Sequence, residues 1–280
     1  ISLDGQIIRA TQQGAADELA ALLDEHPAKL HITGGSWDRP LLHLAAEAGH
    51  DAVVKILLQR GLDVHRRDKW DNATALHWAA EDGRVAIAKR LLDAGADPQG
   101  DGDAHQVGAL GWAAVLGHVR RIGHLRIGTP DDDVAALLLQ RGAKHSIFSA
   151  VALNDADAVR ALVAENPALV RARMSRFESY QTPLHLAVRK DLPEMVALLL
   201  ELGADPREKD ADGATPLRRA TRASDPAIAA LLLAAGADEE DAGGRVPYRY
   251  VTPILSVKNI AASKDYYVDR LGFRIEFEAG

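Results

Sequence analysis

The sequence is 280 residues long, carries a net charge of −7, and is 47% apolar but only 5% aromatic. An interior built mainly from Ala, Leu and Val favours close-packed helices over a β-sandwich. The chain contains no Cys, which excludes disulfides, thiol nucleophiles and thiolate metal ligands. Its acidic charge disfavours nucleic acid as a partner. No apolar run is long enough for a membrane span and no signal peptide stands out, so we expect a cytoplasmic protein.

A short motif recurs along most of the chain at a nearly constant distance. Its copies at His43, His77 and Gly111 are 34 residues apart, and a Gly-containing signature follows 18 residues after both His residues. The copies read LLHLAAEAGH at 41–50, ALHWAAEDGR at 75–84, ALGWAAVLGH at 109–118 and PLHLAVRKDL at 183–192. A fixed period in the low thirties is typical of stacked repeat proteins.

Each unit predicts two helices followed by an extended finger. In the stretch TPLH, Thr182 can cap a helix and Pro183 fits its first turn, where a backbone N–H is not needed. Gly49 suits the left-handed end of a first helix. The second helix, for example AVVKILLQR at 52–60, has its apolar residues at i, i+3 and i+4, and Gly61 ends it.

This pattern resembles ankyrin repeats over residues 3–240. The resemblance implies a mainly α fold, an ankyrin-repeat α-solenoid domain at 1–240 with seven helix–turn–helix units. It also implies a scaffold that binds a partner protein through the concave face of its fingers and first helices. The units are expected near 3–34, 35–68, 69–102, 103–143, 144–174, 175–209 and 210–240.

Three units depart from the repeat pattern. Units one and five share a variant form whose second helix ends at His-Pro or Asn-Pro, which suggests two similar halves. Unit four lengthens the 18-residue spacing to 31, from Gly111 to Gly142, by an insertion between its helices around 119–133. Unit seven has Arg218 at the position of the motif His.

The candidate partner-binding residues lie in the fingers and at the ends of the first helices, where ankyrin-like proteins usually contact partners. Two of the four Trp residues fall in fingers, where the repeat needs no large apolar group, and exposed Trp, Tyr and Arg are typical interface anchors. The alternative is that these rings pack on their neighbouring fingers. The candidates are Trp37, Arg39, Trp70, Asp71, Glu81, Asp82, Glu178, Tyr180, Arg189, Lys190 and Asp212.

The chain has 11 His residues, which raises the alternative of metal or catalytic chemistry. His43, His77 and His185 recur at the period of the fold, which favours hydrogen bonding between neighbouring turns. Glu47 and Glu81 each follow a motif His by four residues, but no HExxH arrangement is present. The repeats also lack a Ser/His/Asp set, a phosphate-binding Gly loop and a paired-carboxylate motif. We therefore expect no catalytic residue, metal or cofactor in them.

The insertion in unit four combines basic and acidic residues. Its basic part could bind a phosphate or an acidic peptide, or it could be a solvated loop. The acidic run at 131–133 follows Thr129 and Pro130, which predicts the N-terminus of a helix with favourable charges. The candidate anion-binding residues are Arg120, Arg121, His124 and Arg126.

The last part of the chain departs from the repeat after a linker at 241–247. Residues 248–280 alternate as strand, helix and strand. They resemble the start of a glyoxalase/bleomycin-resistance (vicinal oxygen chelate) domain, which implies a partial βαβ segment of a domain continuing past residue 280. The alternative function is then an ankyrin-tethered enzyme or small-molecule-binding protein, without a good metal ligand in its first strand. The resemblance rests on Val257–Asn259, Ser263, Tyr266–Tyr267 and Leu271–Phe273.

Overall fold

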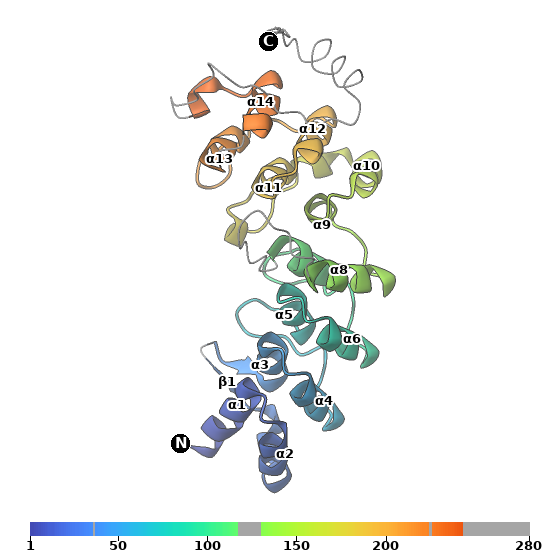
Figure 1. The fold of residues 1–280 in the computed structure, drawn as a ribbon, viewed down its shortest axis with the longest axis vertical. Helices are drawn as coiled ribbons and strands as arrows, with labels where there is room; N and C mark the ends of the chain where they lie inside the picture. Colours follow the sequence, from blue (N-terminus) through green and yellow to red (C-terminus); the bar gives the residue numbers. More distant parts are fainter. Residues whose placement is uncertain (36, 117–129, 224–225, 243–280) are drawn as a thin grey trace, which may run out of the picture.

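The computed structural model describes residues 1–35, 37–116, 130–223 and 226–242. In these residues seven helix pairs stack in chain order into an elongated array, which confirms the expected mainly α repeat fold (Figure 1). The pairs are α1 (Leu3–Gln13) and α2 (Ala16–Glu25), α3 (Leu41–Ala48) and α4 (Asp51–Gln59), α5 (Ala75–Glu81) and α6 (Val85–Asp93), α7 (Gly108–Gly111) with the π-helical segment η2 (Trp112–Leu116) and α8 (Pro130–Gln140), α9 (Ile147–Ala152) and α10 (Ala156–Glu165), α11 (Pro183–Arg189) and α12 (Pro193–Glu201), and α13 (Pro216–Ala223) and α14 (Pro226–Ala234).

Short elements lie between the helix pairs. The strand β1 (Thr33–Gly34) pairs antiparallel with β2 (Arg39–Pro40), with Thr33 opposite Pro40. Four 3₁₀ helices complete the described part: η1 (Pro27–His31), η3 (Pro167–Arg171), η4 (Arg176–Glu178) and η5 (Glu239–Ala242).

The first helices form one layer and the second helices form another, and the core lies between them. Small side chains let the first helices approach each other, since Ala45 and Ala79 are fully buried where α3 packs against α5. Five of the seven second helices have a Leu four residues before their terminal Gly, and full burial of one Leu stabilises the fold by about 1.5–3 kcal/mol. These fully buried residues are Leu57, Leu91, Leu138, Leu199 and Leu232.

Helix ends follow the local chemistry of the repeat. The first helix α3 ends at Gly49, which has φ +81° and donates its N–H to the carbonyls of Ala45 and Ala46. A residue with a Cβ disfavours this left-handed conformation, so Gly is preferred there. Pro130 begins α8, as the Thr-Pro pair before the acidic run predicts.

The connection between α8 and α9 is too short to form a finger. The connections that lead into α3, α5, α7, α11 and α13 contain 14 to 17 residues, whereas six residues, 141–146, connect α8 to α9. The finger before α11 therefore lies directly against the finger before α7, with the rings of Phe177 and His105 5.0 Å apart. The connection from unit four to unit five thus departs from the expectation that a finger follows each second helix.

Two predicted segments lie mostly or wholly outside the described residues. Most of the insertion in unit four, including its four basic candidates, lies outside the described residues. The predicted βαβ segment at 248–280 also lies outside them, and the described part contains a single two-stranded sheet, β1–β2. The βαβ prediction therefore stays a prediction.

Candidate partner-binding face

A buried His in each of three units holds the next finger against the stack. The Nε2 atoms of His43, His77 and His185 lie 3.0, 2.8 and 3.0 Å from the carbonyl oxygens of Ala73, Gly100 and Ala214. Burial lowers the pKa of His43 and His77 to about 4. Burial likewise lowers the pKa of His185. The neutral imidazole therefore donates from Nε2, and this hydrogen bond fixes the position of the next finger relative to the helix that carries the His.

The other ring nitrogen receives hydrogen bonds from the cap of the same helix. The backbone N–H of Thr74 donates to His77 Nδ1 over 3.1 Å, and the hydroxyl of Thr182 lies 2.8 Å from His185 Nδ1. In unit two this cap residue is Pro40, which has no N–H or hydroxyl, and the buried Nδ1 of His43 has no hydrogen-bond partner. The motif His residues are thus structural within the described part of the chain.

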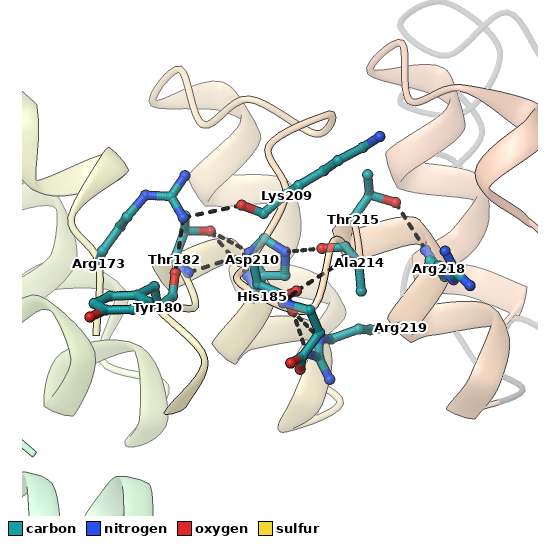
Figure 2. A network of polar contacts seen from close by, with 11 residues as sticks. Arg173, Tyr180, Thr182, His185, Lys209, Asp210, Ala214, Thr215, Arg218 and Arg219 are labelled. Carbon is teal, nitrogen blue, oxygen red and sulfur yellow. Dashed lines mark hydrogen bonds and ion pairs between the residues drawn. The ribbon is translucent and has the colours of Figure 1, made fainter. Parts of the chain in front are cut away.

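Figure 2 shows how the last described finger is fixed. Asp210 accepts the backbone N–H of Ala214 over 3.0 Å and pairs with Arg219. Burial opposes its ionisation, but the N–H of Ala214 and the guanidinium of Arg219 outweigh burial and lower the pKa of Asp210. Arg218, at the motif His position, donates its backbone N–H to Thr215 Oγ1 over 3.3 Å and has an exposed side chain.

The fingers carry the exposed aromatic residues of the described part of the chain. Trp37, Trp70, Phe177 and Tyr180 are between 46% and 59% exposed, and the other exposed large apolar residues in the described part are Ile1 and Leu139. Trp37 and Trp70 contact each other edge to face, with ring centroids 6.1 Å apart. These two rings therefore pack on each other and still present more than half of their surface, and their role in partner binding stays a prediction.

A buried polar layer supports the exposed ring of Trp70. Asp68 accepts the backbone N–H groups of Trp70 and Asp71 over 3.1 and 2.8 Å and the indole N–H of Trp78 over 2.9 Å. Burial, followed by the charge of Asp68, raises the pKa of Asp71. Because the buried Asp68 accepts all three of these hydrogen bonds, it fixes the backbone of the finger at Trp70 against Trp78.

Two of the predicted contact residues are buried rather than exposed. Arg39 stacks its guanidinium 3.6 Å from the ring centroid of Trp78 and donates to Glu47 over 2.7 Å. Glu178 is 7% exposed and accepts the hydroxyl of Ser175 over 2.6 Å. These side chains hold the fingers in place, so they contribute to the face through their neighbours.

The remaining candidates lie at the ends of first helices and in a finger, and their side chains are exposed or half-buried. Glu81 and Asp82 are half-buried at the end of α5, Arg189 is exposed at the end of α11, and Asp212 is exposed and paired with Arg219. The half-buried Lys190 donates from Nζ to the carbonyl of Ala114 over 2.6 Å, which links α11 to η2.

His105, in the finger before α7, contacts the finger before α11, a role that the sequence did not predict. Its Nδ1 lies 2.5 Å from Glu178 Oε1, and its ring packs edge-on against the buried Trp112 at 5.2 Å. Asp71 lies 3.9 Å from Nε2 on the other side. Burial opposes the charged form, but the hydrogen bond and charge of Glu178, with Asp71, outweigh it and raise the pKa of His105. Phe177 was also missed, although an aromatic residue close to the candidates Glu178 and Tyr180 was a usable signal.

A solved ankyrin-repeat structure agrees with this architecture. The human ASB11 ankyrin repeat domain is 22% identical, with a TM-score of 0.52, and the alignment covers 83% of this chain and 98% of that one. A chain in the structure of the Bd0816 predatory endopeptidase from Bdellovibrio bacteriovorus in complex with immunity protein Bd3460 gives 20% identity and a TM-score of 0.45, with coverage of 81% of this chain and 96% of that one. No curated protein matches the chain significantly.

Other comparisons concern the tail and the helices. No glyoxalase/bleomycin-resistance family accompanies the match to the repeats, so that resemblance has no support beyond the residues that suggested it. Among the described residues, no helix has the length and hydropathy of a membrane span. The family model of ankyrin repeats (three copies) matches residues 7–122 and 147–241, which is well over half of the chain. The chain therefore belongs to the ankyrin-repeat family.

Proposed function

We propose that this protein is a binding scaffold that recognises a partner protein through its finger face. We define the finger face as the fingers together with the C-terminal ends of the first helices. The observation that carries the proposal is the location of the exposed aromatic rings, because all four lie in fingers. Large aromatic side chains at a surface are the most frequent energetic anchors of protein interfaces.

Rigidity of the face supports the same function. The finger that carries Trp70 is fixed by Asp68 and by the imidazole of His43, which bonds to the carbonyl of Ala73. A surface whose side chains are already ordered loses little conformational entropy on binding. A repeat stack can therefore present a fixed set of side chains over a long distance.

The experiment compares two variants of the full chain, one that lacks both Trp rings and a single-residue control. Trp37→Ala combined with Trp70→Ala should lower the affinity for a captured partner at least about 30-fold, since the loss of even one hot-spot residue costs about 2 kcal/mol or more. Leu139→Ala removes an exposed apolar side chain from α8, in the layer of second helices, and serves as the matched control. Partner binding that survives the loss of both Trp rings would count against the finger face.

A further inference from the structure

One column of side chains on the finger face changes sign along the stack. The residue four positions after the motif His position lies one turn further along the same helix face in each unit. From unit two to unit six this column reads Glu47, Glu81, Val115, Leu153 and Arg189. It is therefore acidic at one end, apolar in the middle and basic at the other end.

The column is continuous in space. Its members lie at the C-terminal ends of α3, α5, η2, α9 and α11, and these helices contact one another in that order. Figure 1 shows the same order of first helices along the array. The side chain of Glu47 is 42% exposed although it pairs with Arg39, and Arg189 is exposed. Between the charged ends Val115 is buried, so the half-buried Leu153 supplies the accessible apolar surface of the column.

Neighbouring residues reinforce both ends of the column. Asp82 follows Glu81 at the acidic end, and Lys190 follows Arg189 at the basic end, from where its Nζ reaches the carbonyl of Ala114 in η2. The trend is independent of the helices themselves, because the C-terminal end of a helix is electrostatically negative and favours cations. Arg189 satisfies this preference, whereas Glu81 and Asp82 oppose it. Acidic residues are thus present where helix stability alone favours basic ones.

We infer that the partner is a peptide segment that is basic at one end, apolar at its centre and acidic at the other. This inference rests on the proposed function, since it specifies the chemistry of the partner bound on the finger face. Adjacent helices lie about 10 Å apart, so the four steps from α3 to α11 span about 40 Å. About 27 helical residues or about 12 extended residues cover this distance.

Synthetic peptides test the inference directly. A fluorescein-labelled 27-residue peptide with a Lys-rich, a Leu/Ala-rich and a Glu-rich third is compared with a peptide of the same composition whose charges are interspersed. Fluorescence anisotropy with the full chain should show at least tenfold tighter binding of the block peptide. The difference should shrink in about 0.5 M salt, because salt screens charges at a surface. Equal binding of the two peptides would overturn the inference.

A charge-reversal variant tests whether the acidic end of the column binds the basic part of the peptide. Glu81→Lys with Asp82→Lys should weaken the block peptide at least tenfold and should favour a third peptide with Glu-rich ends on both sides. The control, Glu25→Lys with Glu165→Lys, makes the same change in net charge at the exposed C-terminal residues of the second helices α2 and α10. An equal loss in the control would show that net charge, not the column, attracts the peptide. Tight binding of the third peptide shows that the reversed variant is folded.

The two proposals fail separately. If the Trp37 and Trp70 variant loses its partner while block and interspersed peptides bind equally, the finger face stands and the charge order does not. If the block peptide is preferred while the loss of both Trp rings leaves the affinity for the partner unchanged, the aromatic rings are excluded as the main contact.

Discussion

Acidification from pH 8 to pH 5 should destabilise this protein through its buried motif His residues. In the unfolded chain His43 and His77 titrate with a pKa of about 6.5, whereas burial lowers both pKa values to about 4 in the folded protein. Between these values the unfolded state binds more protons, so the free energy of unfolding falls as the pH falls. His105 acts in the opposite direction, because Glu178 raises its pKa in the folded protein.

The size of the effect follows from the two pKa values. One pKa unit corresponds to 1.36 kcal/mol, so each of the two His residues should remove about 2 kcal/mol of stability by pH 5 and about 3 kcal/mol by pH 4. His185 adds to this loss, since burial lowers its pKa as well. Paired carboxylates such as Asp51 and Asp210, whose pKa values are lowered, lose their contribution at lower pH, below their ordinary value of 3.8. The two processes are therefore separated along the pH axis.

Urea unfolding at pH 8, 6.5 and 5 measures this slope. The variant His77→Gln keeps a side-chain donor for the carbonyl of Gly100 but cannot titrate. It should be less stable than the wild type at pH 8, and its further loss on going to pH 5 should be smaller by about 2 kcal/mol. His31→Gln is the control, since His31 is exposed and lies outside the motif. The reasoning fails if His77→Gln and the wild type lose the same free energy over this pH range.

Two further predictions concern single contacts. Pro40→Thr supplies a hydroxyl to the unpartnered Nδ1 of His43, and it should raise the free energy of unfolding by about 1 kcal/mol in urea titrations at pH 8; no change or a loss would contradict the missing hydrogen bond as a source of instability. Glu178→Gln removes the charge beside His105, and it should lower the pKa of His105 measured by NMR and cost about 1–3 kcal/mol at pH 6 but less at pH 8; an unchanged titration would show that Glu178 does not hold the imidazolium.

The helices could be predicted from the sequence because their signals are local. The i, i+3, i+4 spacing of apolar residues, the Thr-Pro starts and the terminal Gly residues act within one unit and repeat in the next. Leu57 and Gly61 illustrate this, since their spacing recurs in five second helices whose Leu is fully buried. Because the same local signals recur in several units, each copy supports the prediction of the fold.

The details of the binding face depended on contacts between units. Trp37 and Arg39 are two residues apart, yet the ring is exposed while the guanidinium is buried on Trp78, which belongs to the next unit. His105 and Glu178 are 73 residues apart and meet because unit five has no finger. No local pattern encodes such a meeting, so sequence reasoning placed Glu178 at the surface and overlooked His105.

The missing finger also bears on how the array folds. The stability of a repeat protein is approximately a sum of terms for single units and terms for the interfaces between neighbours. The boundary between units four and five lacks the finger contact that its counterparts have, and the chain compensates by coupling across it through His105 and Glu178. We therefore expect the four units before this boundary and the three after it to unfold as two blocks. Their coupling strengthens as the pH falls and His105 is protonated, so acid tightens the junction between the blocks while it loosens the His-held fingers within them.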